Sequence, residues 1–587
     1  MKSCFLPFLR CLSLVVGLCV VAGGYALVSA DSGQAENHQK ASRHMVTAAN
    51  PHAAQAGLEI LRAGGSAVDA AIAVEAVLGL VEPQSSGLGG GAFLMHYDPT
   101  AAKGERIDAY DGREMAPAAA TADMFQDVLN DNSKGFYDAV LGGRSVGTPS
   151  VVAMLYLAHQ KRGKLPWGDL FAPALRLAEG GFKVSPRLHY LIDRDPLLRK
   201  MKASRAYFYN ADGKAWPVGH LLKNPAYAKS LKIIARAGAA GFYHGPLAQE
   251  IVAAVQGSEV NPGKLTLEDM AAYKPKLRRP ICGPYRVWTI CGMPPPSSGG
   301  GTVASILGIL QSFDLKAMGA NSLAAVHVIL EAERLAYADR DMYMADSDYV
   351  NVPMALFTDP FYLADRARQI DLQRSMGHAE AGTPPGASRI AFAAGMTPEL
   401  PSTTHFSIVD QWGQMVSMTA TVESAFGSRV MAGGFMLNNE MTDFSLRWER
   451  DGLPVANRIA PGKRPRSSMS PTFVLDEDRN VVMAIGSPGG GSIIAYVAQT
   501  IINVLDWDMD LQQAIDQPHF LTRGGVVSLE RDTGLSALEE PLRDKGHQVR
   551  SRTVNSGLHG IIVHRGADGT WYEGAADKRR EGVVVAD

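Results

Sequence analysis

The chain has 587 residues, of which 46% are apolar and 20% are charged, and its formal net charge is −2. This length allows several hydrophobic cores, or one large domain with insertions. The balanced charge, without any block of like sign, argues against nucleic-acid binding, which needs a basic excess or stripe.

The first thirty residues have the composition of a secretory leader. Lys2 and Arg10 supply positive charge, residues 11–24 are apolar, and the small-residue motif "VSA" ends at Ala30. We therefore predict a signal peptide over residues 1–30 that is cleaved after Ala30. An uncleaved anchor is the alternative, although the apolar run is short and interrupted by glycine. No later stretch of about twenty apolar residues occurs, so we expect a periplasmic or secreted protein without a stable membrane span.

The cysteine count agrees with export. Loss of the leader would leave only Cys282 and Cys291, which flank a predicted turn and strand. Two interpretations of this cysteine pair remain. The cysteines form a local disulfide across a hairpin, or they are buried free thiols. Two cysteines cannot form a zinc cluster, and no HExxH helix is present, so we expect no metal ion.

The N-terminal half contains strong helix signals. Asn50-Pro51 predicts a helix that runs to about Arg62, since it pairs a cap residue with a first-turn proline. Ser66 and Asp69 resemble a capping box for a second helix through about Leu80. A glycine turn then enters the apolar strand of "SSGLGGGAFLMHY".

The middle of the chain is predicted to be mainly helical over residues 150–275. "MPPPSSGGG" reads as a rigid turn that opens onto a helix from Thr302. Residues 376–402 are rich in Pro, Gly, Ala and Ser, which is linker composition.

From Thr403 onward the predicted secondary structure is mainly strand. "THFSIVD" and "MVSMTATV" are predicted strands joined at Gly413, and a second hairpin is predicted over residues 472–487. "GSPGGGS", residues 486–492, then enters a helix and offers backbone N–H groups to a carboxylate or an oxyanion. A tight strand-to-helix turn that needs glycine for steric reasons explains this motif equally well. The signatures GxxxxGK[ST] and GxGxxG are absent, which disfavours nucleotide binding, and we expect no serine-hydrolase elbow.

Thr403 lies between the predicted linker and a strand. A plain β-branched strand residue is the simplest reading. If the chain were cut before Thr403, however, the residue would carry an α-amine with a pKa of about 7.7–8, and this amine could accept the proton of its own hydroxyl.

Eight ordered segments resemble the signature blocks of γ-glutamyltransferases, which are related to the cephalosporin and glutaryl acylases. The blocks run from about residue 40 to the C-terminus, and jointly they are highly specific. They are "NPHAAQAGLEILRAGGSAVDAAIAV", "EPQSSGLGGGAFLMHYD", "DGREMAP", "MPPPSSGGG", "TTHFSIVD", "GGFMLNNEMTDFS", "RPRSSMSPT" and "GSPGGGS".

The resemblance implies an α+β fold, the four-layer αββα arrangement of N-terminal-nucleophile hydrolases. It implies that the chain cuts itself between Ser402 and Thr403. The products would be a large subunit, residues 31–402, and a small catalytic subunit, residues 403–587, which remain associated as a heterodimer. No organic cofactor or metal is implied.

The resemblance also implies the reaction. Thr403 would attack the γ-carbonyl of a γ-glutamyl amide such as glutathione, and the resulting ester would pass its acyl group to water or to an amino acid or peptide amine. Thr421 matches the family's second threonine and would orient the nucleophile. Gly489 and Gly490 would donate N–H groups to the oxyanion.

Recognition of the glutamyl end is implied for five further residues. Arg113 would pair with the α-carboxylate, and Ser467 and Ser468 would add hydroxyl donors. Asp443 would take the α-ammonium, with Glu440 beside it. For Arg113 and Asp443 the alternative is an ordinary surface ion pair.

Two features depart from the family pattern. Glu423 stands where many transferases have asparagine near the substrate amine, and residues 446–463 form a shorter segment than the lid-bearing loop of bacterial members. Both features shift the expectation from transpeptidation toward hydrolase or acylase behaviour.

Two rival functions remain. A glutaryl or cephalosporin acylase of the same family is the first, although Asp443 has no ammonium to bind in a glutaryl group. A non-catalytic binding protein on the same scaffold is the second, and it predicts a chain that is never cut at Thr403.

Overall fold

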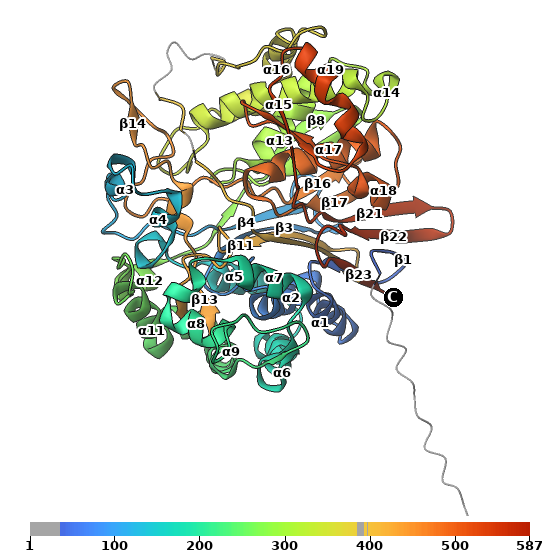
Figure 1. The fold of residues 1–587 in the computed structure, drawn as a ribbon. Helices are drawn as coiled ribbons and strands as arrows, with labels where there is room; N and C mark the ends of the chain where they lie inside the picture. Colours follow the sequence, from blue (N-terminus) through green and yellow to red (C-terminus); the bar gives the residue numbers. More distant parts are fainter. Residues whose placement is uncertain (1–35, 384–391, 396) are drawn as a thin grey trace, which may run out of the picture. The chain divides into compact units, whose positions relative to one another are not determined.

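The computed structural model describes residues 36–383, 392–395 and 397–587 (Figure 1). The predicted leader and part of the predicted linker lie outside these ranges. Within them, no helix is both long and apolar enough to cross a bilayer.

Two seven-stranded antiparallel sheets form the centre of the described region. The first sheet has, in spatial order, β23 (Val583–Ala586), β2 (Met45–Ala48), β10 (Thr404–Val409), β11 (Met415–Thr421), β3 (Gly91–Tyr97), β4 (Ile107–Gly112) and β7 (Lys276–Arg278). The second has β1 (His38–Ala41), β22 (Gly569–Ala576), β21 (His559–Gly566), β17 (Val481–Gly486), β16 (Thr472–Leu475), β9 (Trp288–Gly292) and β8 (Ile281–Tyr285).

The two sheets stack face to face, because β10 and β11 of the first sheet pack on β21 and β17 of the second. Every residue of β10 and β11 is buried. These strands are covered on both faces, so the polar side chains that alternate with apolar ones along β11, such as Ser417 and Thr419, are buried as well. The catalytic hairpin predicted at Thr403 is therefore a rigid central element of the molecule.

Helices cover the outer face of each sheet (Figure 1). On the first sheet lie α1 (Pro51–Arg62), α2 (Ala67–Val81) and α5 (Val151–Arg162). On the second lie α13 (Gly299–Leu310), α17 (Ile493–Leu505) and α18 (Leu511–Asp516), with α15 (Leu323–Tyr343) packed on α13. The predicted four-layer αββα arrangement is confirmed.

The remaining elements surround this centre. The helices are α3 (Gln126–Asn130), α4 (Phe136–Val140), α6 (Ala172–Gly180), α7 (Pro186–Arg194), α8 (Lys202–Phe208), α9 (Pro225–Ala237), α10 (Ala240–Tyr243), α11 (Gly245–Gln256), α12 (Leu267–Ala272), α14 (Leu315–Met318), α16 (Pro360–Ala367) and α19 (Glu539–Asp544). The short strands are β5 (Phe182–Lys183), β6 (Leu221–Leu222), β12 (Met431–Ala432), β13 (Phe435–Met436), β14 (Glu449–Arg450), β15 (Leu453–Pro454), β18 (Phe520–Leu521), β19 (Val527–Glu530) and β20 (Val549–Arg552).

Local sequence signals position the first two helices as predicted. The Asn50 side chain accepts a hydrogen bond from the His52 N–H at the start of α1. Ser66 and Asp69 form a reciprocal capping box at the start of α2. The sequence predicts a helix from Thr302, whereas α13 begins about one turn earlier, at Gly299, inside the glycine run. A Cβ on Gly300 would lie 2.5 Å from the Met293 carbonyl oxygen, which explains why glycine is required there.

The helix-rich and strand-rich segments seen in the sequence interleave in space. β10, which begins directly after Thr403, lies between β2 from the N-terminal segment and its own partner β11. β11 in turn pairs with β3. Both sides of the predicted cut therefore contribute neighbouring strands to one sheet.

Cys282 and Cys291 face each other on the hairpin β8–β9 and form a disulfide. Of the two alternatives for this cysteine pair, the disulfide is the one observed.

Candidate active site

Thr403 lies immediately before β10 and faces the end of β11. The register pairs Thr404 with Ala420, which brings Thr403 opposite Thr421. The two hydroxyl oxygens are 3.0 Å apart, and the Glu423 N–H donates to the Thr421 Oγ at 2.9 Å. Backbone and hairpin register thus hold the Thr421 hydroxyl against the predicted nucleophile.

The backbone at this point is strained. Thr403 has a φ of +79° and Glu423 a φ of +76°. A β-branched residue rarely adopts the left-handed region, and such a conformation costs about 1–3 kcal/mol. The strain at Thr403 lies directly at the peptide bond that the sequence predicts to be cut.

The carbonyl group before Thr403 accepts hydrogen bonds from two donors. Gly489 N–H donates to the Ser402 carbonyl oxygen at 3.1 Å, and the Arg580 guanidinium lies 3.4 Å from the same oxygen. Arg580 also donates to the Thr403 carbonyl oxygen at 2.8 Å. Donors aimed at a carbonyl oxygen stabilise the negative charge that develops when a nucleophile attacks it.

Gly489 has a φ of +140°, and a Cβ at this position would lie 2.7 Å from the Tyr496 ring. The structure gives the turn "GSPGGGS" both features proposed for it, since the turn needs glycine and also aims an N–H at a reacting carbonyl. Burial, with the nearby charge of Arg187, lowers the pKa of Arg580 to about 9. Sequence reasoning missed Arg580, because an arginine in "DKRREG" looks like a surface residue.

Acidic side chains surround Arg113 in the pocket. Its guanidinium donates to Glu440 and, at 2.5 Å, to Asp443, and it is completely buried. The same guanidinium also donates to the backbone carbonyls of Pro465 and Arg466. Arg113 is thus in the predicted place, but its hydrogen-bonding groups are already engaged by protein atoms.

The carboxyl groups of this acidic cluster hold their protons more tightly than usual. Burial, reinforced by the charge of Asp443, raises the pKa of Glu423 to about 8. Burial raises the pKa of Glu440 and Asp443 well above the ordinary range, although Arg113 opposes the shift. Burial likewise raises the pKa of Glu114 to about 7. A cationic group that entered the cluster would favour the ionised forms of these carboxyls.

A second charged group in the pocket centres on Glu399, four residues before the predicted cut. Its carboxylate accepts hydrogen bonds from Arg340 at 2.5 Å and from the Ser468 hydroxyl at 2.8 Å. Two more guanidinium groups lie near it, those of Arg523 at 3.5 Å and Arg466 at 4.0 Å. Burial alone would raise the pKa of Glu399, but the arginines, first of all Arg340, hold it well below the usual range.

One pocket brings the predicted residues together with the segment before the cut. It is lined by Arg113, Glu399, Leu400, Thr403, Thr421, Glu423, Glu440, Asp443, Ser467, Ser468, Met469, Gly490 and Ile493. The cavity volume is about 20 Å³, which is space for about one water molecule. Glu399 and Leu400 are part of the pocket lining in this uncut chain, and the space left beside them is too small for a glutamyl group.

The linker prediction is wrong for the last residues of the segment 376–402. Glu399 is 7% exposed, and Ser402 and Thr403 are each 4% exposed. The Ser402 hydroxyl donates to the Gln84 carbonyl oxygen, and Leu400 N–H donates to Glu423. A separate protease could not reach the Ser402–Thr403 peptide bond without unfolding the site. The geometry therefore favours cleavage by the chain itself.

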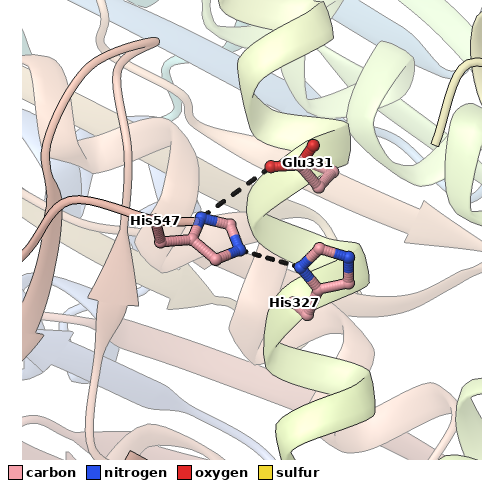
Figure 2. A group of neighbouring side chains, drawn as sticks. All are labelled: His327, Glu331 and His547. Carbon is pink, nitrogen blue, oxygen red and sulfur yellow. Dashed lines mark hydrogen bonds and ion pairs between the residues drawn. The ribbon is translucent and has the colours of Figure 1, made fainter. Parts of the chain in front are cut away.

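A separate buried cluster joins α15 to the loop before β20, as Figure 2 shows. His327 and His547 are hydrogen bonded at 2.8 Å, and Glu331 lies 3.8 Å from the other nitrogen of His547. His327 also contacts the Asp371 carbonyl oxygen, and the Arg334 guanidinium lies 3.4 Å from His547. Burial, with the nearby charge of Arg334, lowers the pKa of His547 to about 3. Hydrogen bonds account for all four ring nitrogens, so we assign the cluster to packing between elements.

Known proteins resemble this chain over most of its length. The family model for gamma-glutamyltranspeptidase matches residues 53–587. The glutathione hydrolase proenzyme of Escherichia coli (strain K12) is 38% identical over 555 residues, covering 92% of this chain and 91% of that protein. The acylase ACY 1 proenzyme of Pseudomonas sp. (strain SE83) is 35% identical over 561 residues, covering 93% of this chain and 94% of that protein.

A solved structure shows the same architecture. The cephalosporin acylase from Bacillus halodurans superimposes with a TM-score of 0.80 at 26% identity, covering 96% of this chain and 99% of that one. The chain is therefore an enzyme of the γ-glutamyltranspeptidase family, with the N-terminal-nucleophile hydrolase fold.

Proposed function

We propose that Thr403 first cuts its own chain and then acts as the nucleophile of a γ-glutamyltransferase that also hydrolyses glutathione. The observation that carries the proposal is the geometry at one peptide bond. The Thr403 hydroxyl is held by Thr421, and the adjacent Ser402 carbonyl oxygen already accepts a hydrogen bond from Gly489.

The cutting step needs only atoms of the chain and one water molecule. Thr403 Oγ attacks the Ser402 carbonyl carbon, and the oxyanion is stabilised by Gly489 N–H and Arg580. The C–N bond then breaks, the nitrogen leaves as an amine that has gained the hydroxyl proton, and an ester remains. Water hydrolyses the ester to a Ser402 carboxylate and a free Thr403 hydroxyl. Strain at Thr403 is relieved when the bond breaks.

The mature nucleophile then has its own base. The freed α-amine of Thr403 has an ordinary pKa of about 7.7–8, and it lies a few bonds from the hydroxyl whose proton it accepts. The hydroxyl attacks the γ-carbonyl of a γ-glutamyl amide, the amine leaves with a proton, and a γ-glutamyl ester forms. Water or a second amine takes the acyl group and restores Thr403.

The acidic cluster supports recognition of an ammonium group. Asp443, Glu440 and Glu423 all line the pocket with Thr403. Arg113 pairs with Glu440 and Asp443, so one guanidinium serves a group of three carboxyls, and a donor with an α-ammonium would add a second positive charge. The family resemblance assigns the α-carboxylate of the donor to Arg113, Ser467 and Ser468, of which Arg113 is already paired with carboxylates of the chain.

The first sheet would keep the two subunits associated after the cut. The cut would separate residues 31–402 from 403–587, yet β10 hydrogen-bonds to β2 across the divide. The composition of residues 1–30 and the disulfide between Cys282 and Cys291 support export to an oxidising compartment.

A glutaryl or cephalosporin acylase is the second candidate, favoured by the likeness to the Bacillus halodurans acylase. The two candidates differ in the need for an ammonium on the donor. We expect faster turnover of a γ-glutamyl anilide than of its glutaryl analogue, because Asp443 and its neighbours have no partner in a glutaryl group. Preference for the glutaryl compound would establish the acylase.

The central test is the N-terminus of the purified protein. We expect two fragments by intact mass, one of which begins at Thr403, and we expect Thr403→Ala to remain a single chain. Thr403→Ser retains a hydroxyl and an α-amine and is expected to cut. An uncut parent that still releases glutamate would refute Thr403 as the nucleophile.

A further inference from the structure

Glu82 is a buried carboxyl group in a place that does not suit a carboxylate. It directly follows the last residue of α2 and is 1% exposed. Neither of its carboxyl oxygens has a hydrogen-bond partner among the described residues. Burial without donors disfavours the charged form, and so does the partial negative charge at the C-terminus of a helix. A buried polar group of this kind needs an explanation.

The loop that begins at Glu82 contacts the residues around the predicted cut. The Gln84 carbonyl oxygen accepts a hydrogen bond from the Ser402 hydroxyl at 2.7 Å. The Ser85 carbonyl oxygen accepts from the Val422 N–H at 3.2 Å, just beyond the end of β11. Glu82 is therefore only two residues from a direct contact with Ser402.

Arg580 has the complementary problem, since it is a buried cation without a direct ion pair. Its Nε donates to the Asn555 side chain at 3.1 Å, and its two Nη atoms donate to the carbonyl oxygens of Thr403, Ser402 and Asn555. All of these acceptors are uncharged, and within the described ranges no carboxylate forms a salt bridge with this guanidinium. A buried charge is costly unless a counter-charge compensates it.

Glu82 and Arg580 act on each other through their charges. Burial raises the pKa of Glu82, and the charges of Arg187 and Arg580 oppose this shift. Burial and the charge of Arg187 lower the pKa of Arg580, and the charge of Glu82 opposes this shift more strongly than that of Asp577. Asp577 is already engaged, because it pairs with Arg579 at 3.3 Å. Glu82 is thus the acidic side chain that remains to compensate Arg580.

We propose that Glu82 is a positioning residue for the self-cleavage, whose carboxylate holds the Arg580 guanidinium against the carbonyl oxygens of Ser402 and Thr403. The inference rests on the proposed function and adds to it a residue that acts only through Arg580. Without the charge of Glu82, the repulsion between Arg187 and Arg580 is no longer compensated. The guanidinium then moves away from the carbonyl oxygen that becomes the oxyanion.

The pairing of the two charges is tested first in a chain that cannot cut. In the Thr403→Ala background, Glu82→Gln should lower the melting temperature by about 2–4 °C, because it leaves a buried guanidinium without its counter-charge. When Arg580→Gln is also present, the same substitution should lower the melting temperature by less than half as much. No loss in the first background, or equal losses in both, would overturn the proposal.

The second arm measures the rate of the cut as the time course of precursor conversion. Loss of one oxyanion donor costs about 10²–10³ in rate, so displacement of one of two donors by Glu82→Gln should slow the cut about 10-fold. Glu82→Asp keeps the charge and should recover part of the rate, which a purely structural role would not predict.

Glu75→Gln is the matched control for both arms. Glu75 lies on the same helix, is buried, and has carboxyl oxygens without a hydrogen-bond partner in the described part of the chain. Burial raises its pKa without any contribution from an arginine. The Glu75→Gln precursor should therefore cut at the parental rate.

The two arms separate the possible failures. Equal rates for Glu82→Gln and Glu82→Asp would show that the charge of Glu82 does not affect the cut, which overturns the proposal even if the melting temperatures reveal a pair. A Glu75→Gln precursor that cuts as slowly as Glu82→Gln would overturn it as well. A parent that never cuts would refute the proposed function, whereas the melting temperatures would still report on the pair because they use uncut chains.

Discussion

Replacement of Thr421 by valine tests how the nucleophile is oriented. Valine has the shape of threonine, so Thr421→Val removes the hydroxyl that lies 3.0 Å from Thr403 Oγ and leaves the strand β11 otherwise unchanged. A neutral hydrogen bond contributes about 0.5–1.5 kcal/mol net, which corresponds to an approximately two- to thirteen-fold slower cut if the bond orients the attacking oxygen. The Glu423 N–H would also lose its acceptor, which costs the folded chain about 1–3 kcal/mol.

The assay is the time course of precursor conversion into two fragments after rapid purification. Thr421→Ser keeps the hydroxyl and is the matched control, with a rate near that of the parent. Melting temperatures of all three proteins separate slower chemistry from lower stability. A valine variant that cuts at the parental rate would show that Thr421 only stabilises the strand end.

Three further predictions concern the surroundings of the cut and the buried charges. Arg580→Gln should slow the cut more than Arg580→Lys, measured in the same time course, because only lysine keeps a positive charge near the Ser402 carbonyl; equal rates would contradict this. Gly490→Ala should also slow the cut, since its Cβ would lie 2.5 Å from the Leu400 carbonyl oxygen and displace the segment; normal processing of this variant would show that the segment adjusts. Burial raises the pKa of Glu75 to about 8, so the folded chain binds the proton more tightly than the unfolded chain, and the free energy of unfolding should fall by about 1.4 kcal/mol per pH unit from about pH 5 to pH 8. Urea melts at pH 6 and pH 8 should show a smaller fall for Glu75→Gln, and equal falls would refute the assignment.

Local features of the fold could be predicted where short-range chemistry decides them. The caps at Asn50 and Ser66 fix helix starts through side-chain hydrogen bonds over two or three residues. The β10–β11 hairpin is set by its turn at Gly413. The sheet order was beyond such reasoning, because β2 and β10 are far apart in sequence and pair only through the tertiary fold.

The residues of the site divide in the same way, into those that the sequence could predict and those that it could not. The nucleophile and the glycine turn carry motifs that the family resemblance makes recognisable, although each alone fits a plain strand residue or a tight turn. The charged group around Glu399 carries no such motif, because Glu399 lies in a segment of linker composition and its partners Arg340 and Arg523 come from distant elements. Charged residues of this kind look like ordinary surface residues until the fold shows that they are buried together.

The two ends of the described chain meet on the first sheet, with consequences for engineering. The backbone carbonyl of Asp587 accepts from the N–H groups of Arg43 and His44, and Val584 N–H donates to the Glu36 carbonyl. A short linker could therefore join Asp587 to Glu36, and a circular permutant could open at Thr403. After removal of its initiating methionine, the permuted chain would begin at Thr403 and would carry the free α-amine without any self-cleavage. It would show whether self-cleavage serves any purpose beyond creating a new first residue.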